Sequence, residues 1–499
     1  KKWWKICQKE LPFDPKYCWE INRHQSLPLL ALAMKLNNGY ALAAGKEFHN
    51  YLLAWFEENP PECGINWGSN LEVALRAISW CLAYWMIRPA GAQNDDFWPK
   101  YLSYLHHHGV HLEKYLFYTK ACIPNNHLLG EVTALVLLGI LFGKENWLNY
   151  RGLLEWLALE QFYPDGVNFE QSINYHQFSL KLLLLADVFL ERIGHPCNQR
   201  IRERLGHALS FLRWVRKPDG AWPNIGDNDN GVVFPEGMEA IFLNGSSIHP
   251  GSTHEEGNSK FFTTGGFYVW RSGWDSDSSY LIVKAGPHKF HAHADLLHFE
   301  YSHQGESIFV DSGTYQYNKV PELRRYFRST RDHNTATINE HDQSRPLNTF
   351  RWLSSAKTVD ISFYEAGENC SIIFDAAVQF PGTKYIHRRV IETCRDLSPL
   401  SIFDWFKGGS KAAVYFHLSP DIQVEIHNNN SIKLIMPLGR KLFIQFESIS
   451  AYSVKLESMP FAARYGEIKS HPVVCVSLIN KLKHINLQTS ISTDEIQAH

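Results

Sequence analysis

The stretch NGSSIHPGSTHEEGNSK, at residues 244–260, separates two halves of the chain that differ in their hydrophobic period. It is polar and rich in glycine and serine, a composition typical of a linker. Before it, apolar residues recur at helical spacing, and after it the period changes to two, which is typical of strands. We therefore predict two domains, at residues 1–248 and 249–499.

The first half predicts many helices. The clearest apolar segments have the pattern of amphipathic or buried helices and are bounded by Asn, Gly or Pro. They lie at residues 71–87, 128–141 and 172–193. Repeated helices of this kind predict an α/α bundle or toroid.

The second half predicts short strands separated by turns such as those at residues 303–305 and 428–430. The segments with a strand pattern lie at residues 267–270, 280–284, 298–301, 307–310, 414–418 and 433–436. Short strands at this density predict an antiparallel β-sandwich. The predicted fold class is multidomain, with a helical N-terminal domain followed by this sandwich.

Composition limits the classes of function. The chain has 499 residues, of which 44% are hydrophobic and 20% charged, an ordinary globular composition. Its formal net charge of -2 argues against wholesale nucleic-acid binding, although a local basic groove could still hold an acidic polymer. No apolar run reaches the roughly 18 residues of a membrane helix, so we expect no membrane partner. The nine cysteines contain no CxxC pair and predict thiols, not disulfides.

The sharpest chemical cluster is HAHAD at residues 291–295, which is followed by Asp311 and His333. Because residues two apart in a strand face the same side, we expect His291 and His293 to share one cavity. Two imidazoles and a carboxylate suffice for Zn²⁺ or a similar divalent ion, and the predicted ligands are His293, Asp311 and His333. His291 would remain free for proton transfer. Chance clustering among 25 histidines is the alternative interpretation.

Two further clusters stand at predicted helix starts. We expect Asn126 to be the N-cap of the helix at 128–141, with His127 beside it, where the helix dipole would stabilise a substrate carboxylate. The plainer interpretation is that Asn126 only caps. Tyr175, between an Asn and a His, is either a proton donor or a packing residue.

A basic run lies close to His333 and predicts contacts with carboxylate or sulfate, unless it is a solvated face. Its members are Arg324, Arg325, Arg328 and Arg331.

These clusters, in this order, resemble the heparinase II/III family of polysaccharide lyases. The matching segments are WEINRH at 19–24, NWGSNLE at 66–72, NH at 126–127, QSINYH at 171–176, HAHAD at 291–295, VDSGTY at 310–315, HNT at 333–335 and HRR at 387–389. The resemblance implies an incomplete α/α toroid joined to an antiparallel β-sandwich, with the active site in the cleft between them. The first half is short for the family, which leaves endo or exo action open.

The resemblance also implies roles for particular residues. Asn126 and His127 would neutralise a uronate carboxylate, Tyr175 would be the catalytic tyrosine and His291 the catalytic histidine. The family's zinc-type ligands fall on the three predicted metal ligands, and we expect a structural Zn²⁺ that fixes His291 and does not touch the substrate. The residues expected to contact substrate are Trp67, Glu131, Arg324, Tyr326 and Arg328.

The implied activity is β-elimination on a glycosaminoglycan like heparin or heparan sulfate, and alginate or another bacterial uronate polymer is the alternative. His291, with a pKa near neutrality, would be the base and Tyr175 the acid, or Tyr175 would make both transfers if proton and leaving group share a face. A hydrolase would need two facing carboxylates, and Glu131, Glu170 and Asp227 form no persuasive pair. A non-catalytic carbohydrate-binding protein is the third alternative.

Location and assembly are less constrained by the sequence. The family habit predicts the periplasm or secretion, whereas the chain shows no signal peptide at its start and its unpaired cysteines fit the cytoplasm. The oligomeric state stays open.

Overall fold

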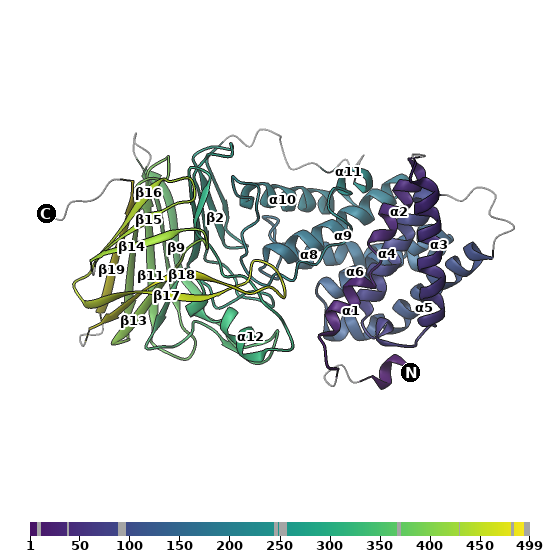
Figure 1. Ribbon diagram of the computed structural model, residues 1–499, viewed down its shortest axis with the longest axis horizontal. Helices are drawn as coiled ribbons and strands as arrows, with labels where there is room; N and C mark the ends of the chain where they lie inside the picture. The colour runs from purple at the N-terminus through teal and green to yellow at the C-terminus, as the bar shows by residue number, and fades with distance from the viewer. Residues whose placement is uncertain are drawn as a thin grey trace. The chain divides into compact units, whose positions relative to one another are not determined.

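A computed structural model describes residues 1–6, 11–36, 39–87, 96–243, 248, 257–366, 371–428, 430–480 and 484–493. Helices make up the first half and antiparallel sheets the second (Figure 1), which confirms the predicted fold class. The α-helices of the first half are α1 (Pro15–Ile21), α2 (Ser26–Lys35), α3 (Ala41–Glu58), α4 (Asn70–Ile87), α5 (Phe97–Cys122), α6 (Asn126–Phe142), α7 (Glu145–Leu148), α8 (Arg151–Gln161), α9 (Ile173–Arg192), α10 (Gln199–Val215) and α11 (Glu239–Phe242). Of the proposed linker, residues 244–247 and 249–256 lie outside the described residues.

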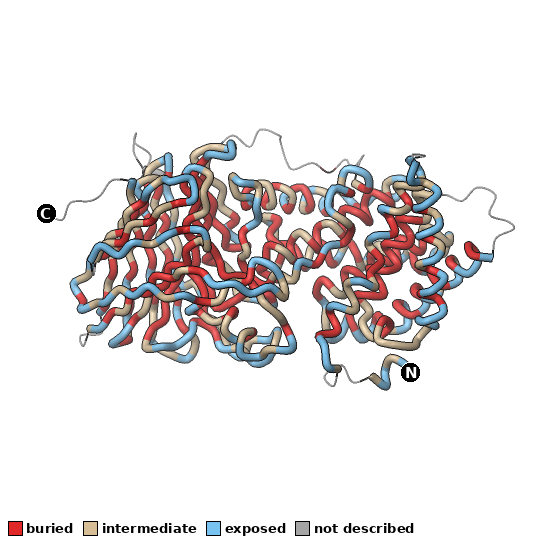
Figure 2. The backbone as a smooth tube through the Cα atoms, viewed as in Figure 1, coloured by how far each residue is buried: buried red, intermediate tan, exposed pale blue. Residues whose placement is uncertain are grey.

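Helix α6 is the buried centre of the helical half. Every residue from Leu128 to Gly139 is buried (Figure 2), and a helix apolar on all sides belongs in the interior of a bundle. Helices α4, α5, α7 and α8 contact it. Gly143, with a left-handed φ of 63°, caps its C-terminus. The predicted helices at 71–87, 128–141 and 172–193 correspond to α4, α6 and α9.

Within its described residues, the second half contains three larger sheets and one two-stranded sheet, β7 (Arg345–Pro346) with β8 (Trp352–Ser354). The five-stranded sheet has the order β1 (Ser259–Phe262), β2 (Phe267–Arg271), β3 (Tyr280–Lys284), β4 (His298–His303) and β5 (Glu306–Phe309). The eight-stranded sheet has the order β14 (Gln423–Asn428), β15 (Ser431–Ile435), β16 (Lys441–Glu447), β19 (His484–Ser492), β12 (Leu400–Lys407), β11 (Ile386–Thr393), β10 (Ser371–Gln379) and β9 (Lys357–Ala366). The four-stranded sheet has the order β17 (Ala451–Phe461), β18 (Lys469–Ile479), β13 (Lys411–His417) and β6 (Ala336–Ile338).

The three larger sheets share one apolar core. Phe299 of β4, Phe374 of β10 and Val414 of β13 all belong to the same cluster of buried side chains. Along β12 the odd-numbered and even-numbered positions differ in burial, which is the period of two that the sequence predicted. Between β5 and β6 lie the short helix α12 (Pro321–Phe327) and a 3₁₀ turn at Thr330–Asp332.

Contacts between Cα atoms divide the chain into two compact units. The helical unit comprises Lys1–Phe162, Gln177–Gly206 and Gly231–Pro250, and the β unit comprises Tyr163–His176, His207–Asn230 and Gly251–His499. The beginning of α9 and the segment after α10 are thus part of the β unit. The domain boundary at residues 248 and 249 stays a prediction.

Two expectations from composition can be compared with the described residues. Among these, no helix is both long and apolar enough to cross a membrane. The seven described cysteines are all free thiols, and Cys122 is exposed while Cys81, Cys197 and Cys475 are buried.

Candidate active site and metal centre

Three segments of the β unit meet around Asp227: residues 170–175 at the start of α9, residues 225–229, and residues 291–293. Main-chain hydrogen bonds join them, because the His291 N–H donates to the Glu170 carbonyl at 3.1 Å and the Asp227 N–H donates to the His291 carbonyl at 2.8 Å. Gly226 makes the close approach possible. Its φ is +77°, and a Cβ there would lie 2.6 Å from the Gln171 carbonyl oxygen and 2.9 Å from that of His291.

The prediction that His291 and His293 lie in a strand was wrong, because both belong to the loop between β3 and β4. Gly286 and Pro287 lie just beyond the end of β3 at Lys284, and these residues interrupt a strand. The two imidazoles nevertheless share a partner. Nδ1 of His291 lies 2.8 Å from Oδ2 of Asp227, and Nε2 of His293 lies 2.9 Å from its Oδ1. A common carboxylate, not strand alternation, brings them together.

Asp227 is fully buried and has a third partner, Arg324 of α12. Nη2 of Arg324 donates to Oδ2 of Asp227 at 2.8 Å, and Nη1 donates to Oδ1. Burial alone would favour the neutral acid, but the Arg324 guanidinium and the hydrogen bonds from both histidines hold the pKa of Asp227 well below its usual range. Asp227 is therefore an ionised carboxylate that only accepts hydrogen bonds.

Tyr175 stacks on His291. Their ring centroids lie 3.8 Å apart with an interplanar angle of 7°, so the predicted catalytic tyrosine and histidine are in direct contact. The Tyr175 hydroxyl donates to Asp229 at 3.2 Å and lies 3.1 Å from the hydroxyl of Tyr317. Burial, aided by the negative charges of Asp229 and Asp227, raises the pKa of Tyr175 well above its ordinary value, so the phenol keeps its proton at neutral pH.

His291 has a carboxylate at each ring nitrogen, since its Nε2 lies 3.2 Å from Glu170. Burial opposes the charged ring, but the hydrogen bonds to Asp227 and Glu170 prevail and raise the pKa of His291 to about 9. The expected pKa near neutrality is therefore not found in this structure. Tyr175, His291 and Tyr317 keep 8%, 5% and 6% of their surface exposed, whereas Asp227 and Glu170 keep none. The stacked rings of Tyr175 and His291, here called the ring pair, are therefore more accessible than these two carboxylates.

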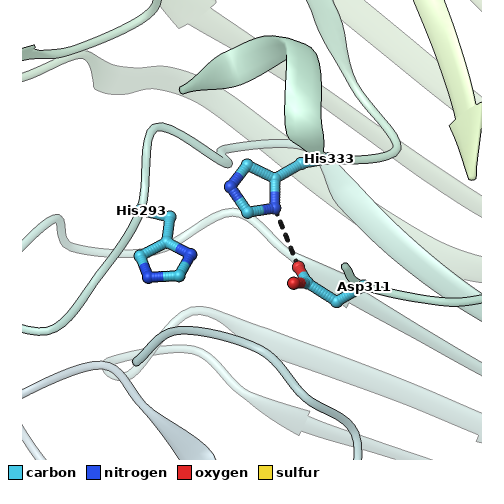
Figure 3. A group of neighbouring side chains, drawn as sticks. All are labelled: His293, Asp311 and His333. Atoms are coloured by element: carbon cyan, nitrogen blue, oxygen red, sulfur yellow. Dashed lines mark hydrogen bonds and ion pairs between the residues drawn. The ribbon is translucent and has the colours of Figure 1, made fainter. Parts of the chain in front are cut away.

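The three predicted metal ligands, His293, Asp311 and His333, converge in one buried group (Figure 3). Each offers a ligand atom, and these atoms lie within 4.8 Å of one another. Nδ1 of His333 lies 2.9 Å from Oδ2 of Asp311. Nδ1 of His293 and Nε2 of His333 are buried and have no hydrogen-bond partner in the described part of the chain, which is costly unless another group satisfies them. The group could therefore bind a metal ion, and its donor set suits Zn²⁺ and other divalent transition metals.

The start of α6 differs by one residue from the prediction. Asn125, not Asn126, is the N-cap, because Asn125 has non-helical φ and ψ and its side chain accepts the His127 N–H at 3.1 Å. Asn126 is the first helical residue and is buried, and His127 follows it, half-buried, in the first turn.

Four of the predicted residues belong to the helical unit: Asn126, His127, Glu131 and Trp67. Glu131 is fully buried, and its Oε2 accepts from Asn70 at 3.4 Å. Burial raises its pKa to about 8. Trp67 is fully buried in the 3₁₀ turn Ile65–Trp67, so its indole presents no free face to a sugar in this structure. Their predicted roles stay predictions.

The basic run divides by burial. Arg324 is buried and donates hydrogen bonds to Asp227. Arg328 is buried with its guanidinium 4.1 Å from the ring centre of Trp352. Nη1 of Arg328 donates to the main-chain carbonyls of Asn348 and Thr349, each at 2.8 Å. The contacts of Arg324, Arg328 and the half-buried Tyr326 with substrate stay predictions. Arg325 and Arg331 are exposed.

Sequence reasoning missed the partners of Tyr175 and of the two histidines. These are Asp227, the common acceptor of His291 and His293, together with Glu170, Asp229 and Tyr317. Glu170 and Asp227 had been considered only as hydrolase carboxylates. Asp227 and Asp229 lie in the segment IGDNDNG at 225–231, and such a run of Gly, Asp and Asn is first interpreted as a turn. The available signal was two acids in one predicted loop ahead of the histidine cluster.

The chain thus combines helices followed by antiparallel sheets, a stacked tyrosine–histidine pair and a buried group that could bind a metal ion. Two family models match the chain. The model described as Heparinase II/III N-terminus matches residues 2–238, and the model described as Heparinase II/III-like, C-terminal, matches residues 255–493. The chain therefore belongs to the heparinase II/III family, which confirms the resemblance seen in the sequence.

Individual relatives are distant. A heparin-sulfate lyase of Bacteroides stercoris is 25% identical over 545 aligned positions, which cover 100% of this chain and 75% of that protein. A heparin-sulfate lyase of Pedobacter heparinus is 23% identical, over 74% of this chain and 59% of the relative. A crystal structure of heparinase III superposes with a TM-score of 0.76 at 17% identity, covering 98% of this chain and 79% of that one, and this likeness confirms the fold alone.

Proposed function

We propose that this protein is a lyase that cleaves a uronic-acid-containing polysaccharide by β-elimination and leaves unsaturated uronate ends. The observation that carries the proposal is the Tyr175–His291 ring pair, stacked at 3.8 Å in a member of the heparinase II/III family. A phenol and an imidazole in contact, each with an exposed edge, are the two proton-transfer groups that an elimination requires.

The chemistry asks for three things at one sugar ring. The C5 proton of a uronate is too weakly acidic to leave unless the neighbouring carboxylate is neutralised, so that the enolate-like intermediate is stabilised. A base must then take that proton while an acid protonates the departing O4. We propose that Asn126 and His127 neutralise the carboxylate, as the family resemblance implies.

The roles within the ring pair follow from what each ring contacts. Tyr175 keeps its proton, as its contact with Asp229 and its raised pKa indicate, and is the proposed acid. His291 is the proposed base for a sugar whose C5 proton and O4 lie on opposite faces. This role requires the neutral ring, so with a pKa of about 9 for His291 the activity on that sugar should rise with pH. For the epimer that has both on one face, Tyr175 would make both transfers. It would have to start as the phenolate, take the C5 proton and pass a proton to O4. The positive charge of His291, which is stacked on the ring and bound by a carboxylate at each nitrogen, would favour that phenolate.

Variants assayed on polymers of both uronate epimers test these roles. We expect Tyr175→Phe to be inactive on both polymers, because no group replaces its hydroxyl. His291→Ala should be inactive where His291 is the base and should keep residual activity where Tyr175 serves both transfers. Near-normal turnover in both folded variants would overturn the assignment.

The proposed substrate is a glycosaminoglycan of the heparin or heparan-sulfate type. The names of the two relatives support it, and alginate or another bacterial uronate polymer is the alternative within the class. A panel of polysaccharides, assayed for the ultraviolet absorbance of new unsaturated ends, distinguishes the two. Activity on heparan sulfate and none on alginate is the expected result, and the reverse would replace the proposed substrate.

We propose that the group formed by His293, Asp311 and His333, here called the metal group, holds Zn²⁺ in a structural role. A bound ion would supply a fixed positive charge that ties together the loops carrying its ligands. His293, Asp311 and His333 all belong to the β unit and keep no more than 1% of their surface exposed, so they are poorly placed to present an ion to a polymer.

The two other classes find less support. A glycoside hydrolase needs two free carboxylic groups across the sugar, and both oxygens of Asp227 are already occupied by His291, His293 and Arg324. A non-catalytic carbohydrate-binding protein would bind the polymer without producing unsaturated ends, and its Tyr175→Phe variant would bind equally well.

A further inference from the structure

We propose that Asp227 is a positioning residue shared by the ring pair and the metal group, one carboxylate oxygen orienting His291 and the other orienting His293. The part concerning His291 rests on the proposed function, whereas the part concerning His293 rests only on the metal group. Asp227 has no exposed surface, so it acts through these histidines and does not touch a substrate.

The first step concerns His293. Its Nε2 lies 2.9 Å from Oδ1 of Asp227, and an ionised carboxylate can only accept, so Nε2 carries the proton. The lone pair is therefore on Nδ1, which is buried and has no hydrogen-bond partner among the described residues. Metal-binding histidines are typically held in this way, with a carboxylate on the nitrogen that does not bind the metal. Asp227 thus selects the tautomer of His293 that can bind an ion together with Asp311 and His333.

The second step concerns His291. Its Nδ1 donates to Oδ2 of Asp227 at 2.8 Å, and its main-chain carbonyl accepts the Asp227 N–H, also at 2.8 Å. Ring and backbone are therefore tied to the same residue. The Ser172 hydroxyl donates to the Asp227 carbonyl at 2.5 Å and accepts the Tyr175 N–H at 3.2 Å, which links Asp227 to the other ring of the pair.

The third step concerns the carboxylate itself. Arg324 contacts both of its oxygens and is in turn held by the Thr349 carbonyl, to which its Nε and Nη2 donate at 3.1 and 2.9 Å. This bidentate contact between the Arg324 guanidinium and Asp227 fixes the plane of the carboxylate. An asparagine would present an NH₂ group in place of one acceptor oxygen, so one of the two histidines would lose its acceptor.

The test compares wild type, Asp227→Asn, Asp227→Glu and a control. Asp187→Asn is the matched control, because Asp187 is also a fully buried carboxylate bound by an arginine, Arg202, but belongs to the helical unit. Asp227→Glu keeps the charge that Arg324 requires and moves the oxygens by one methylene, so it reports even if the asparagine variant does not fold. The readouts are Zn²⁺ affinity by competition with a chromophoric chelator, the Co²⁺ absorption spectrum, and kcat and KM.

We expect Asp227→Asn to weaken Zn²⁺ binding about 10- to 100-fold and to lower kcat by a similar factor with little change in KM. Asp227→Glu should show a smaller loss of both, with an altered Co²⁺ spectrum. Asp187→Asn should keep wild-type affinity and kcat once folded. The affinity and spectrum need no substrate, so they report on Asp227 even if the protein proves not to be a lyase.

Three results would overturn the inference. One is wild-type Zn²⁺ affinity in both folded Asp227 variants. Another is the absence of metal binding in the wild-type chain, which would remove the role at His293. The third is an active wild type whose Asp227 variants keep normal kcat, which would remove the role at His291 and leave the lyase proposal intact.

Discussion

Asp227 and Asp404 have partners of the same residue types, arginine and histidine. They differ in where these partners lie in the chain and in what the partners contact in turn. Each is a fully buried carboxylate bound by an arginine and by histidine. Asp404 lies on β12 directly opposite Arg389 on β11, and His387 of the same strand contacts it at 2.7 Å. Its partners are 15 and 17 residues away in sequence, whereas those of Asp227 are 64, 66 and 97 residues away.

The difference shows how an ion pair that stabilises strands is distinguished from a group that organises a site. At Asp404 a sheet ladder already holds the partners, and the charges satisfy one another. At Asp227 the partners come from a loop and from a helix, and the two histidines have further contacts. His291 stacks on the ring of Tyr175, and His293 belongs to the metal group. Residue types alone would not separate the two cases.

The largest expected effect is that of Tyr175→Phe. Removing the hydroxyl should lower turnover on the order of 10⁴-fold, because the proposed acid is lost, while the ring still stacks on His291 and the fold is kept. Steady-state assays and circular dichroism measure the two properties. Tyr415→Phe is the control, since Tyr415 is a buried tyrosine of β13 whose hydroxyl lies 3.3 Å from that of Thr337. Equal turnover in Tyr175→Phe and Tyr415→Phe would contradict a catalytic role for the Tyr175 hydroxyl.

Next in size is the effect of His293→Ala compared with His387→Ala. Both remove a buried histidine bound to a buried aspartate. His293→Ala should weaken Zn²⁺ binding by about 100-fold or more. Zn²⁺ at about 100 times its wild-type Kd should stabilise wild type and His387→Ala by about 2.7 kcal/mol and His293→Ala by about 0.4 kcal/mol or less. Thermal unfolding with and without Zn²⁺ provides the measurement, and equal stabilisation of all three proteins would contradict the assigned ligand.

Asp404→Asn should act on stability and not on the site. Replacing one member of a buried ion pair is expected to lower the free energy of unfolding by about 3 kcal/mol. Arg389 keeps its main-chain acceptors, the carbonyls of Leu297 and Asn334, so the geometry nearby should persist. Denaturant unfolding and a Zn²⁺ titration of the folded variant test this. A loss of Zn²⁺ affinity as large as that of Asp227→Asn would remove the distinction between the two carboxylates.

Glu131 supplies a third case, a buried carboxylate for which the described residues provide amide and hydroxyl partners, Asn70 and Thr119, and no ion pair. Burial raises its pKa to about 8 from the ordinary 4.5, so the folded protein holds a proton that the unfolded chain releases. The stability that this protonated form contributes should therefore be lost as the pH rises from about 4.5 to about 8. Glu131→Gln should remove this part of the slope of unfolding free energy against pH. An unchanged slope would show that Glu131 is ionised in the folded state.

The sequence predicted best those helices and strands whose structure depends on their own residues. Helix α6 and the strands β2 and β3 could be predicted because each is a run of mostly apolar residues that is buried along its length. Two adjacent asparagines, Asn125 and Asn126, are equally good caps by composition, and only the backbone dihedrals distinguish them.

The site could be predicted only in part for a related reason. His293, Asp311 and His333 belong to motifs that sequence resemblance carries, and the structure brings them together. Asp227 could not be recognised in the same way, because its role depends on three contacts with residues far away in the chain. A period of two also placed His291 and His293 in a strand, where Gly286 and Pro287 indicate a loop.

The most direct test of the central claim is a mass measurement on one defined uronate-containing oligosaccharide. Elimination adds no water, so we predict that the masses of the two fragments sum to the mass of the substrate, and that Tyr175→Phe forms neither fragment. Fragments whose summed mass exceeds the substrate by one water would show hydrolysis. That result, or intact substrate after incubation with every uronate polymer of the panel, would contradict the account.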